Sequence, residues 1–196
     1  MENNIGLLLT RRAELNRDRE AYVDSATRDR WTFGQLETRT NQLSNSLVNG
    51  GVEPGDRVAL LMMNSVEFVE SYLALAKVGA IVVPLNWRLV ADELEFIMKD
   101  SGSTLCIYGE EFFDLASDLQ GRGDKTDVKR WLQVGGESPF ADDYDVFRNA
   151  GSEELPPIRA RDDDMLYIMY TSGTTGLPKG VMHTHSTTFG ALFSFG

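Results

Sequence analysis

Residues 56–85 read DRVALLMMNSVEFVESYLALAKVGAIVVPL, and their hydrophobic pattern determines the expected fold. Val58–Met63 is a continuous apolar run of strand length, which is typical of a strand covered on both faces. Asn64, three residues before a glutamate, resembles the start of a capping box, and Gly79 ends the helix that follows. Ala80–Leu85 is a second apolar run of the same kind. The stretch therefore predicts two parallel strands joined by a helix.

The alternation of strand and helix continues along the chain. A helix at 33–47 precedes the stretch, and a helix at 91–99 and a strand at Thr104–Tyr108 follow it. Such alternation with short connections predicts an α/β fold with a largely parallel, helix-covered sheet, in which Val58–Met63, Ala80–Leu85 and Thr104–Tyr108 are neighbours. Weaker patterns predict a helix at 5–15, strands at 21–24 and 30–33, a helix at 110–119, a strand at 130–134 and a helix at 141–149.

We expect three parts in the chain: an α/β subdomain at 1–150, a connector at 151–164, and a final part at 165–196. The final part holds a strand, a phosphate-binding loop, a second strand and the start of a truncated helix. The connector lacks periodicity and contains Pro156-Pro157. Its three aspartates, Asp162–Asp164, are interpreted as a solvated boundary, because three adjacent carboxylates cannot all face one metal ion on a regular backbone.

Charge and composition narrow the classes of function. The 196 residues include 19 basic and 30 acidic side chains, a formal charge of −11, and 42% of them are hydrophobic. This apolar content supports a packed core, while the negative charge disfavours binding to nucleic acid or to anionic membranes. No stretch of about 20 apolar residues is present, so we expect no transmembrane segment, and peripheral membrane contact stays open. Cys106 has no partner for an internal disulfide, so we expect a cytoplasmic protein with an inert core thiol.

The last 26 residues differ from the rest, because they contain no acidic residue, one lysine and both histidines. An apolar strand at Met165–Tyr170 runs into TSGTTGLPKG at residues 171–180. Glycines let a ligand approach the backbone N–H groups, hydroxyls donate hydrogen bonds to phosphate oxygens, and the Lys179 ammonium neutralises charge. The stretch therefore predicts a polyphosphate-binding loop.

This loop differs from the Walker loop, G-x-x-x-x-G-K-[ST]. Pro178 precedes the lysine and Gly180 follows it, so the Walker pattern fails at both positions. The next residues, Val181–His185, alternate like a strand, whereas a Walker loop is followed by a helix. We predict a flexible loop between two strands, with His183 and His185 on one face of the second strand. Two imidazoles without a third ligand make a weak metal site, so packing or hydrogen bonding is the preferred interpretation.

Residues Tyr170–Val181, with the sequence YTSGTTGLPKGV, resemble the signature of the adenylate-forming enzymes, which comprise acyl-CoA synthetases, luciferases and peptide-synthetase adenylation domains. The stretches at 31–36 and 55–89 are similar to the N-terminal region of that family. Ile168–Tyr170 and His183–His185 most resemble the fatty acyl-CoA synthetases of the long- and very-long-chain type. The resemblance implies the first part of the large N-terminal domain of such an enzyme.

By this resemblance, a carboxylate attacks the α-phosphate of ATP to give an acyl-adenylate and pyrophosphate, and coenzyme A then displaces AMP. ATP, Mg²⁺ and coenzyme A are the implied cofactors and co-substrates, and a fatty acid is the implied substrate partner. Lys179 is the implied catalytic residue, because its charge would stabilise the leaving pyrophosphate. Thr171 is the implied metal ligand. The implied nucleotide-binding residues are Thr171, Ser172, Gly173, Thr174, Thr175, Gly176 and Lys179.

Members of that family are much longer than this chain, so we expect an N-terminal fragment that is inactive alone. Residues 187–196 are strongly apolar. We expect their large side chains to be disordered or buried in self-association, namely Phe189, Leu192, Phe193 and Phe195. A second hypothesis stays open, which is a stand-alone non-catalytic module that binds a nucleotide or another protein. Trp87 and Arg88 are interpreted as rim residues of a substrate site or interface.

Overall fold

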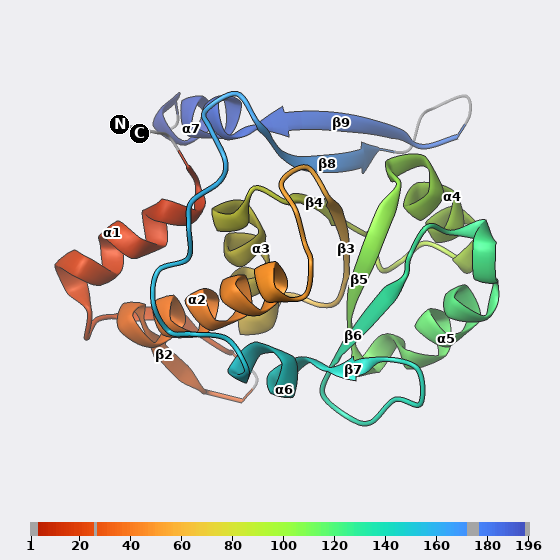
Figure 1. The fold of residues 1–196 in the computed structure, drawn as a ribbon, viewed down its shortest axis with the longest axis horizontal. Helices are drawn as coiled ribbons and strands as arrows, with labels where there is room; N and C mark the ends of the chain where they lie inside the picture. Colours follow the sequence, from red (N-terminus) through yellow and green to blue (C-terminus); the bar gives the residue numbers. More distant parts are fainter. Residues whose placement is uncertain (1–3, 26, 172–176, 195–196) are drawn as a thin grey trace.

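Among residues 4–25, 27–171 and 177–194, which the computed structural model describes, seven strands form one sheet. The strand order is β7-β6-β5-β3-β4-β8-β9 (Figure 1). Neighbours pair in parallel except β8 and β9, which are antiparallel. The strands are β3 (Arg57–Leu61), β4 (Ile81–Pro84), β5 (Ser103–Gly109), β6 (Arg130–Val134), β7 (Asp142–Asp143), β8 (Met165–Thr171) and β9 (Lys179–Thr184). A separate antiparallel pair, β1 (Glu20–Val23) and β2 (Arg30–Thr32), comes earlier in the chain.

Helices cover the sheet on both sides. The α-helices of the described residues are α1 (Gly6–Asn16), α2 (Phe33–Asn49), α3 (Val66–Val78), α4 (Ala91–Ser101), α5 (Phe113–Gly121), α6 (Tyr144–Asn149) and α7 (His185–Ser194). Short 3-10 turns occupy Glu110–Phe112 and Gly123–Lys125. Within this described part of the chain, no helix is both long enough and apolar enough to cross a bilayer.

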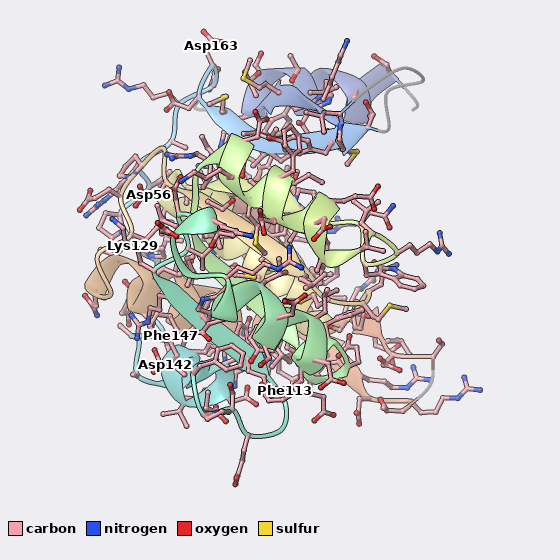
Figure 2. All side chains as sticks on the ribbon, turned by 90° about the vertical axis from the view of Figure 1, so that its right-hand side faces the viewer. Asp56, Phe113, Lys129, Asp142, Phe147 and Asp163 are labelled. Atoms are coloured by element: carbon pink, nitrogen blue, oxygen red, sulfur yellow. The ribbon has the colours of Figure 1, made fainter. Side chains whose placement is uncertain are left out.

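The three strands predicted to be neighbours are neighbours. β3 lies between β4 and β5 and pairs with both in parallel. Successive side chains of β3 point to opposite faces. Val58 and Leu60 pack with α2 and α3. Ala59 and Leu61 pack with α4 and α5, which lie side by side on their face (Figure 2). Because helices cover both faces, β3 is apolar at successive positions. The predicted α/β fold with a largely parallel, helix-covered sheet is confirmed.

Two predicted helix starts are displaced in the structure. The N-cap of α3 is Ser65 rather than Asn64, because the Ser65 hydroxyl accepts a hydrogen bond from the backbone N–H three residues later, at 3.2 Å. The helix predicted at 141–149 begins only at Tyr144. Its first residues instead form β7, Asp142–Asp143, which pairs with β6, and the second of these aspartates caps the helix.

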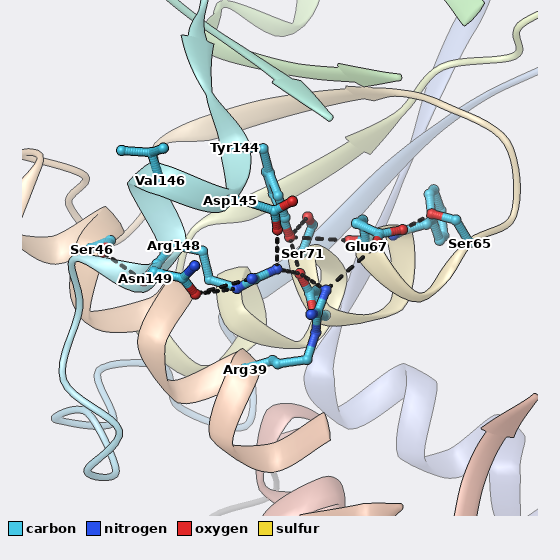
Figure 3. Close-up of polar contacts among 12 residues, drawn as sticks. Arg39, Ser46, Ser65, Glu67, Ser71, Tyr144, Asp145, Val146, Arg148 and Asn149 are labelled. Atoms are coloured by element: carbon cyan, nitrogen blue, oxygen red, sulfur yellow. Dashed lines mark hydrogen bonds and ion pairs between the residues drawn. The ribbon is translucent and has the colours of Figure 1, made fainter. Parts of the chain in front are cut away.

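A buried ion cluster joins α6 to α2 and α3. Glu70 on α3 is fully buried. The Arg39 Nε donates to Glu70 Oε2 at 2.5 Å, and the Arg148 Nη1 donates to Glu70 Oε1 at 3.2 Å. The Tyr144 hydroxyl donates to the same Oε1 at 2.7 Å, and burial raises the pKa of this phenol, so it stays protonated. Figure 3 shows Arg39 and Arg148 approaching each other from different helices beside Tyr144.

Between α6 and β8 the chain has no helix or strand. Asn45 on α2 holds this segment, because its Nδ2 donates to the carbonyl oxygens of Ser152 at 2.9 Å and Glu154 at 2.8 Å. Asp163, near the other end, is exposed and points away from the molecule (Figure 2). Strands β8 and β9 then extend the same seven-stranded sheet next to β4.

Candidate active site

The hairpin of β8 and β9 carries the site predicted from the sequence. β8 ends at Thr171, β9 begins at Lys179, and these two residues face each other in the antiparallel ladder. The other predicted binding residues lie outside the described residues, namely Ser172, Gly173, Thr174, Thr175 and Gly176. A strand follows the loop here, as predicted, where a Walker loop would be followed by a helix.

Thr171 and Lys179 point to the same face of the hairpin, because directly opposed residues of an antiparallel pair share a face. Their Cβ atoms are therefore about 5 Å apart, and both residues are exposed. The next pair on that face, Met169 and Val181, is also exposed, by 47% and 44%. A hydroxyl-bearing and an ammonium-bearing side chain thus project from opposed positions on one exposed face, at the loop end of the hairpin. This arrangement can bind a multiply charged anion.

Tyr170 points to the opposite face, toward α4. Its cross-strand partner is Gly180, and a Cβ at that glycine would lie 2.8 Å from the Ile168 side chain and 3.1 Å from the Tyr170 ring. The absence of a side chain therefore lets the ring lie across β9. The Tyr170 hydroxyl donates to Asp100 Oδ2 on α4 at 2.6 Å. Burial and this neighbouring carboxylate raise the pKa of Tyr170, which keeps the phenol protonated.

The two histidines do not share one face of a strand, so that prediction was wrong. β9 ends at Thr184 and α7 begins at His185. His183 stacks on Tyr167, with ring centroids 4.5 Å apart. His185 is fully buried, and its Nδ1 accepts a hydrogen bond from the Ile5 N–H at 3.0 Å. The preferred interpretation, packing or hydrogen bonding, is confirmed for both.

We expect the neutral His185 to make stability depend on pH. Burial lowers its pKa, and the carboxylates of Asp164 and Asp162 offset this effect only partly. The unfolded chain binds a proton at this side chain below about pH 6.5, whereas the folded chain resists it. The free energy of unfolding should therefore fall as the pH drops below about 6.5, by up to about 1.4 kcal/mol per pH unit. Above about pH 6.5 His185 is neutral in both the folded and the unfolded chain, so it no longer makes the free energy of unfolding depend on pH.

Urea unfolding at several values between about pH 5.5 and 7.5 measures this dependence, in a range above the titration of most carboxylates. His185→Asn should flatten the slope of unfolding free energy against pH. His183→Asn is the matched control, because His183 is only partly buried and stacks on the Tyr167 ring, away from the buried position of His185. An equal slope in His185→Asn and in the unsubstituted chain would contradict the prediction.

Helix α7 packs against other parts of the chain. Phe189 is buried beside Ile5, Ala76 and Leu166, so the expectation that its side chain lacks a partner within this chain was wrong. Leu192 is 55% exposed. The side chains of Phe193 and Phe195 lie outside the described residues.

The residues interpreted as a rim are partly exposed. Trp87 is 39% exposed, its ring lies 6.4 Å from that of Phe112, and the Arg88 guanidinium stacks over it at 4.7 Å. Cys106 is fully buried as a free thiol in the cluster beneath α4 and α5, and burial raises its pKa. A thiol with a raised pKa is a poor nucleophile, which fits an inert core residue.

The donor set of the hairpin fits a nucleotide phosphate better than a metal ion alone. Mg²⁺ prefers carboxylate, phosphate and water oxygens in octahedral geometry. Thr171 offers one hydroxyl, and the described residues contain no group of three or more histidine, cysteine, aspartate or glutamate side chains that could hold an ion. Thr171 could therefore contribute one ligand to an ion that phosphates and other groups also bind. The Lys179 ammonium, by contrast, can bind a phosphate directly, without a metal ion between them.

Comparisons with known proteins show which family this chain resembles. The sequence profile of the AMP-binding enzymes matches residues 9–195. The chain is 41% identical over 193 residues to the long-chain-fatty-acid–CoA ligase FadD13 of Mycobacterium tuberculosis, covering 98% of this chain and 37% of that protein. It is 33% identical over 183 residues to a medium/long-chain-fatty-acid–CoA and 3-oxocholest-4-en-26-oate–CoA ligase of Mycolicibacterium smegmatis, covering 90% of this chain and 32% of that protein.

A solved structure extends the similarity to three dimensions. The inhibitor-bound N-terminal domain of FACL13 from Mycobacterium tuberculosis superposes with a TM-score of 0.90 at 39% identity, covering all of this chain and 47% of that one. The chain thus spans less than half the length of the relatives it matches.

Proposed function

This chain belongs to the AMP-binding enzyme family, and we propose that it forms the N-terminal part of a fatty acyl-CoA ligase. The proposal rests on one observation above all: Thr171 and Lys179 lie opposed at the end of a hairpin whose sequence, YTSGTTGLPKGV, carries the family signature. Similarity to fatty-acid–CoA ligases over 98% of the chain supports the substrate class.

The proposed reaction has two steps. In the first, a carboxylate oxygen of the fatty acid bonds to the α-phosphorus of ATP, and the bond from that phosphorus to the bridging oxygen of the β-phosphate breaks. Acyl-adenylate and pyrophosphate result. In the second step, the sulfur of coenzyme A bonds to the acyl carbon, the acyl–oxygen bond to AMP breaks, and the thiol proton is released. The products are acyl-CoA and AMP.

The residues of this chain act in the first step. In this proposal the Lys179 ammonium neutralises negative charge as pyrophosphate leaves, which lowers the barrier as other positioned cations do in phosphoryl transfer. Thr171 is the cross-strand partner of this lysine, and its hydroxyl can donate to a phosphate oxygen or ligate Mg²⁺. Mg²⁺, when bound, would supply further charge neutralisation. We assign the rest of the phosphate-binding set to Ser172, Gly173, Thr174, Thr175 and Gly176.

Two further expectations accompany this function. Because the chain spans 37% of FadD13, we expect residues 1–196 alone not to complete the reaction. We also propose a cytoplasmic location, which a lone buried thiol suits because reducing compartments keep cysteines free. Self-association and peripheral membrane contact stay as expectations.

Product analysis tests the proposed function. The protein expressed from its complete coding sequence, called the complete protein below, would be incubated with ATP, Mg²⁺, coenzyme A and fatty acids of graded chain length. We expect AMP, pyrophosphate and acyl-CoA in equal amounts, and none of them without a fatty acid. ADP and inorganic phosphate as products, or AMP formation that does not depend on the acid, would reject the proposal.

A further inference from the structure

We infer that Tyr170 and Asp100 form a positioning pair that holds the loop end of the nucleotide-binding hairpin on helix α4. This inference rests on the proposed function and adds residues to it. Asp100 lies 70 residues before Tyr170 and outside the signature, yet the hydroxyl of one meets the carboxylate of the other at 2.6 Å. β8 ends beside α4 in Figure 1, in agreement with this contact.

Two features position the Tyr170 ring for this contact. Gly180 has no side chain, and a Cβ there would come within 3.1 Å of the Tyr170 ring. The ring can therefore lie over Gly180, on the face where its hydroxyl meets Asp100 of α4. Ile168, on the same face, packs in the cluster that contains α4 residues, so the ring lies on a fixed surface.

The position of Asp100 has an electrostatic cost. It occupies the last turn of α4, which ends at Ser101. Negative charge near a helix C-terminus is unfavourable, because it faces the negative end of the helix dipole. The hydrogen bond from the Tyr170 hydroxyl offsets this cost, since a hydrogen bond to a charged group is stronger than one between neutral groups.

The geometry connects this anchor to the charged residues. Tyr170 and Gly180 form one rung of the ladder, and Thr171 and Lys179 form the next. The two rungs point to opposite faces. Holding Tyr170 on α4 therefore fixes the backbone from which the Thr171 hydroxyl and the Lys179 ammonium project on the other side. A displacement of about 1 Å at reacting groups can cost about a hundredfold in rate.

Substitutions in the complete protein test this role by fatty-acid-dependent exchange of pyrophosphate into ATP. Tyr170→Phe keeps the ring and removes the hydroxyl, and Asp100→Asn removes the charge. We expect each to lower the maximal exchange rate about tenfold. The double variant should be no slower than either single one, because both remove the same contact. The KM for ATP should change less than the rate.

Two matched controls separate positioning from general damage. Tyr167→Phe removes a hydroxyl from the same strand while keeping the ring that stacks on His183. Asp92→Asn removes an exposed carboxylate from the first turn of α4. Both should exchange at the rate of the unsubstituted protein. All variants should unfold at similar urea concentrations.

A second readout does not depend on activity. In the chain of residues 1–196, Tyr170→Phe should speed hydrogen exchange at the backbone amides of residues 169–171 and 179–181. Tyr167→Phe should leave these exchange rates unchanged. Rates of pyrophosphate exchange in Tyr170→Phe and Asp100→Asn equal to those of the controls would overturn the inference. Additive losses in the double variant would overturn it as well. If the unsubstituted complete protein does not exchange pyrophosphate into ATP, both the proposed function and the positioning role are rejected.

Discussion

Lys179→Ala in the complete protein is expected to slow acyl-adenylate formation by about a hundredfold to a thousandfold. Removing one preorganised donor from a developing negative charge typically costs about 2.7–4 kcal/mol of transition-state stabilisation. Lys179 is exposed at the loop end of the hairpin, opposite Thr171, so loss of its side chain leaves the packed core untouched. Pyrophosphate release in a single turnover measures this step directly.

The control is Lys125→Ala, because Lys125 is also exposed but lies on the second 3-10 turn, outside the hairpin. It should release pyrophosphate at the unsubstituted rate. Lys179→Arg keeps the charge and should retain part of the rate. Pyrophosphate release at an unchanged rate in Lys179→Ala would show that this lysine does not act on the leaving group.

Glu70→Ala should lower the free energy of unfolding by about 3–5 kcal/mol. The carboxylate of Glu70 is fully buried and accepts hydrogen bonds from Arg39, Arg148 and Tyr144. Removing one partner of a buried ion pair is the costly case, and here it leaves Arg39 and Arg148 with only the more exposed carboxylates of Glu67 and Asp145. The Arg148 side chain is 6% exposed, so water cannot replace the lost carboxylate easily. Urea unfolding of the chain measures the effect.

Glu67→Ala provides the comparison on the same helix. Glu67 is 22% exposed at its side chain and meets Arg39 Nη2 at 3.3 Å. A partly solvated pair of this kind contributes about 1 kcal/mol or less. A loss in Glu70→Ala no larger than the loss in Glu67→Ala would mean that the buried cluster contributes little to holding α6.

The fold could be predicted from the sequence because its signals are local. Continuous apolar runs such as Val58–Met63, bounded by helices with a 3.6-residue pattern, indicate strands covered on both faces. The TSGTTGLPKG stretch at 171–180 likewise has its spacing within one loop. Such features depend on neighbours in the chain, so the residues alone carry the information.

What the sequence could not predict depends on long-range contacts. Asp100 meets Tyr170 across 70 residues, and nothing in either local pattern indicates the pair. One missed boundary is local instead. His183 and His185 alternate as a strand would, but Thr184 caps α7: its Oγ1 accepts a hydrogen bond from the Thr187 N–H at 3.1 Å, and the Thr187 Oγ1 accepts one from the Thr184 N–H at 3.0 Å. Glu70 gave no signal either, since an acidic residue on an amphipathic helix is normally exposed.

Isotope transfer from the fatty acid tests the central claim most directly. The complete protein would react a fatty acid labelled with ¹⁸O in its carboxylate, together with ATP, Mg²⁺ and coenzyme A, and the AMP would be weighed by mass spectrometry. Attack of the carboxylate on the α-phosphorus places one ¹⁸O in AMP. The account predicts AMP heavier by one ¹⁸O, together with acyl-CoA. Unlabelled AMP, or label appearing in inorganic phosphate instead, would contradict it.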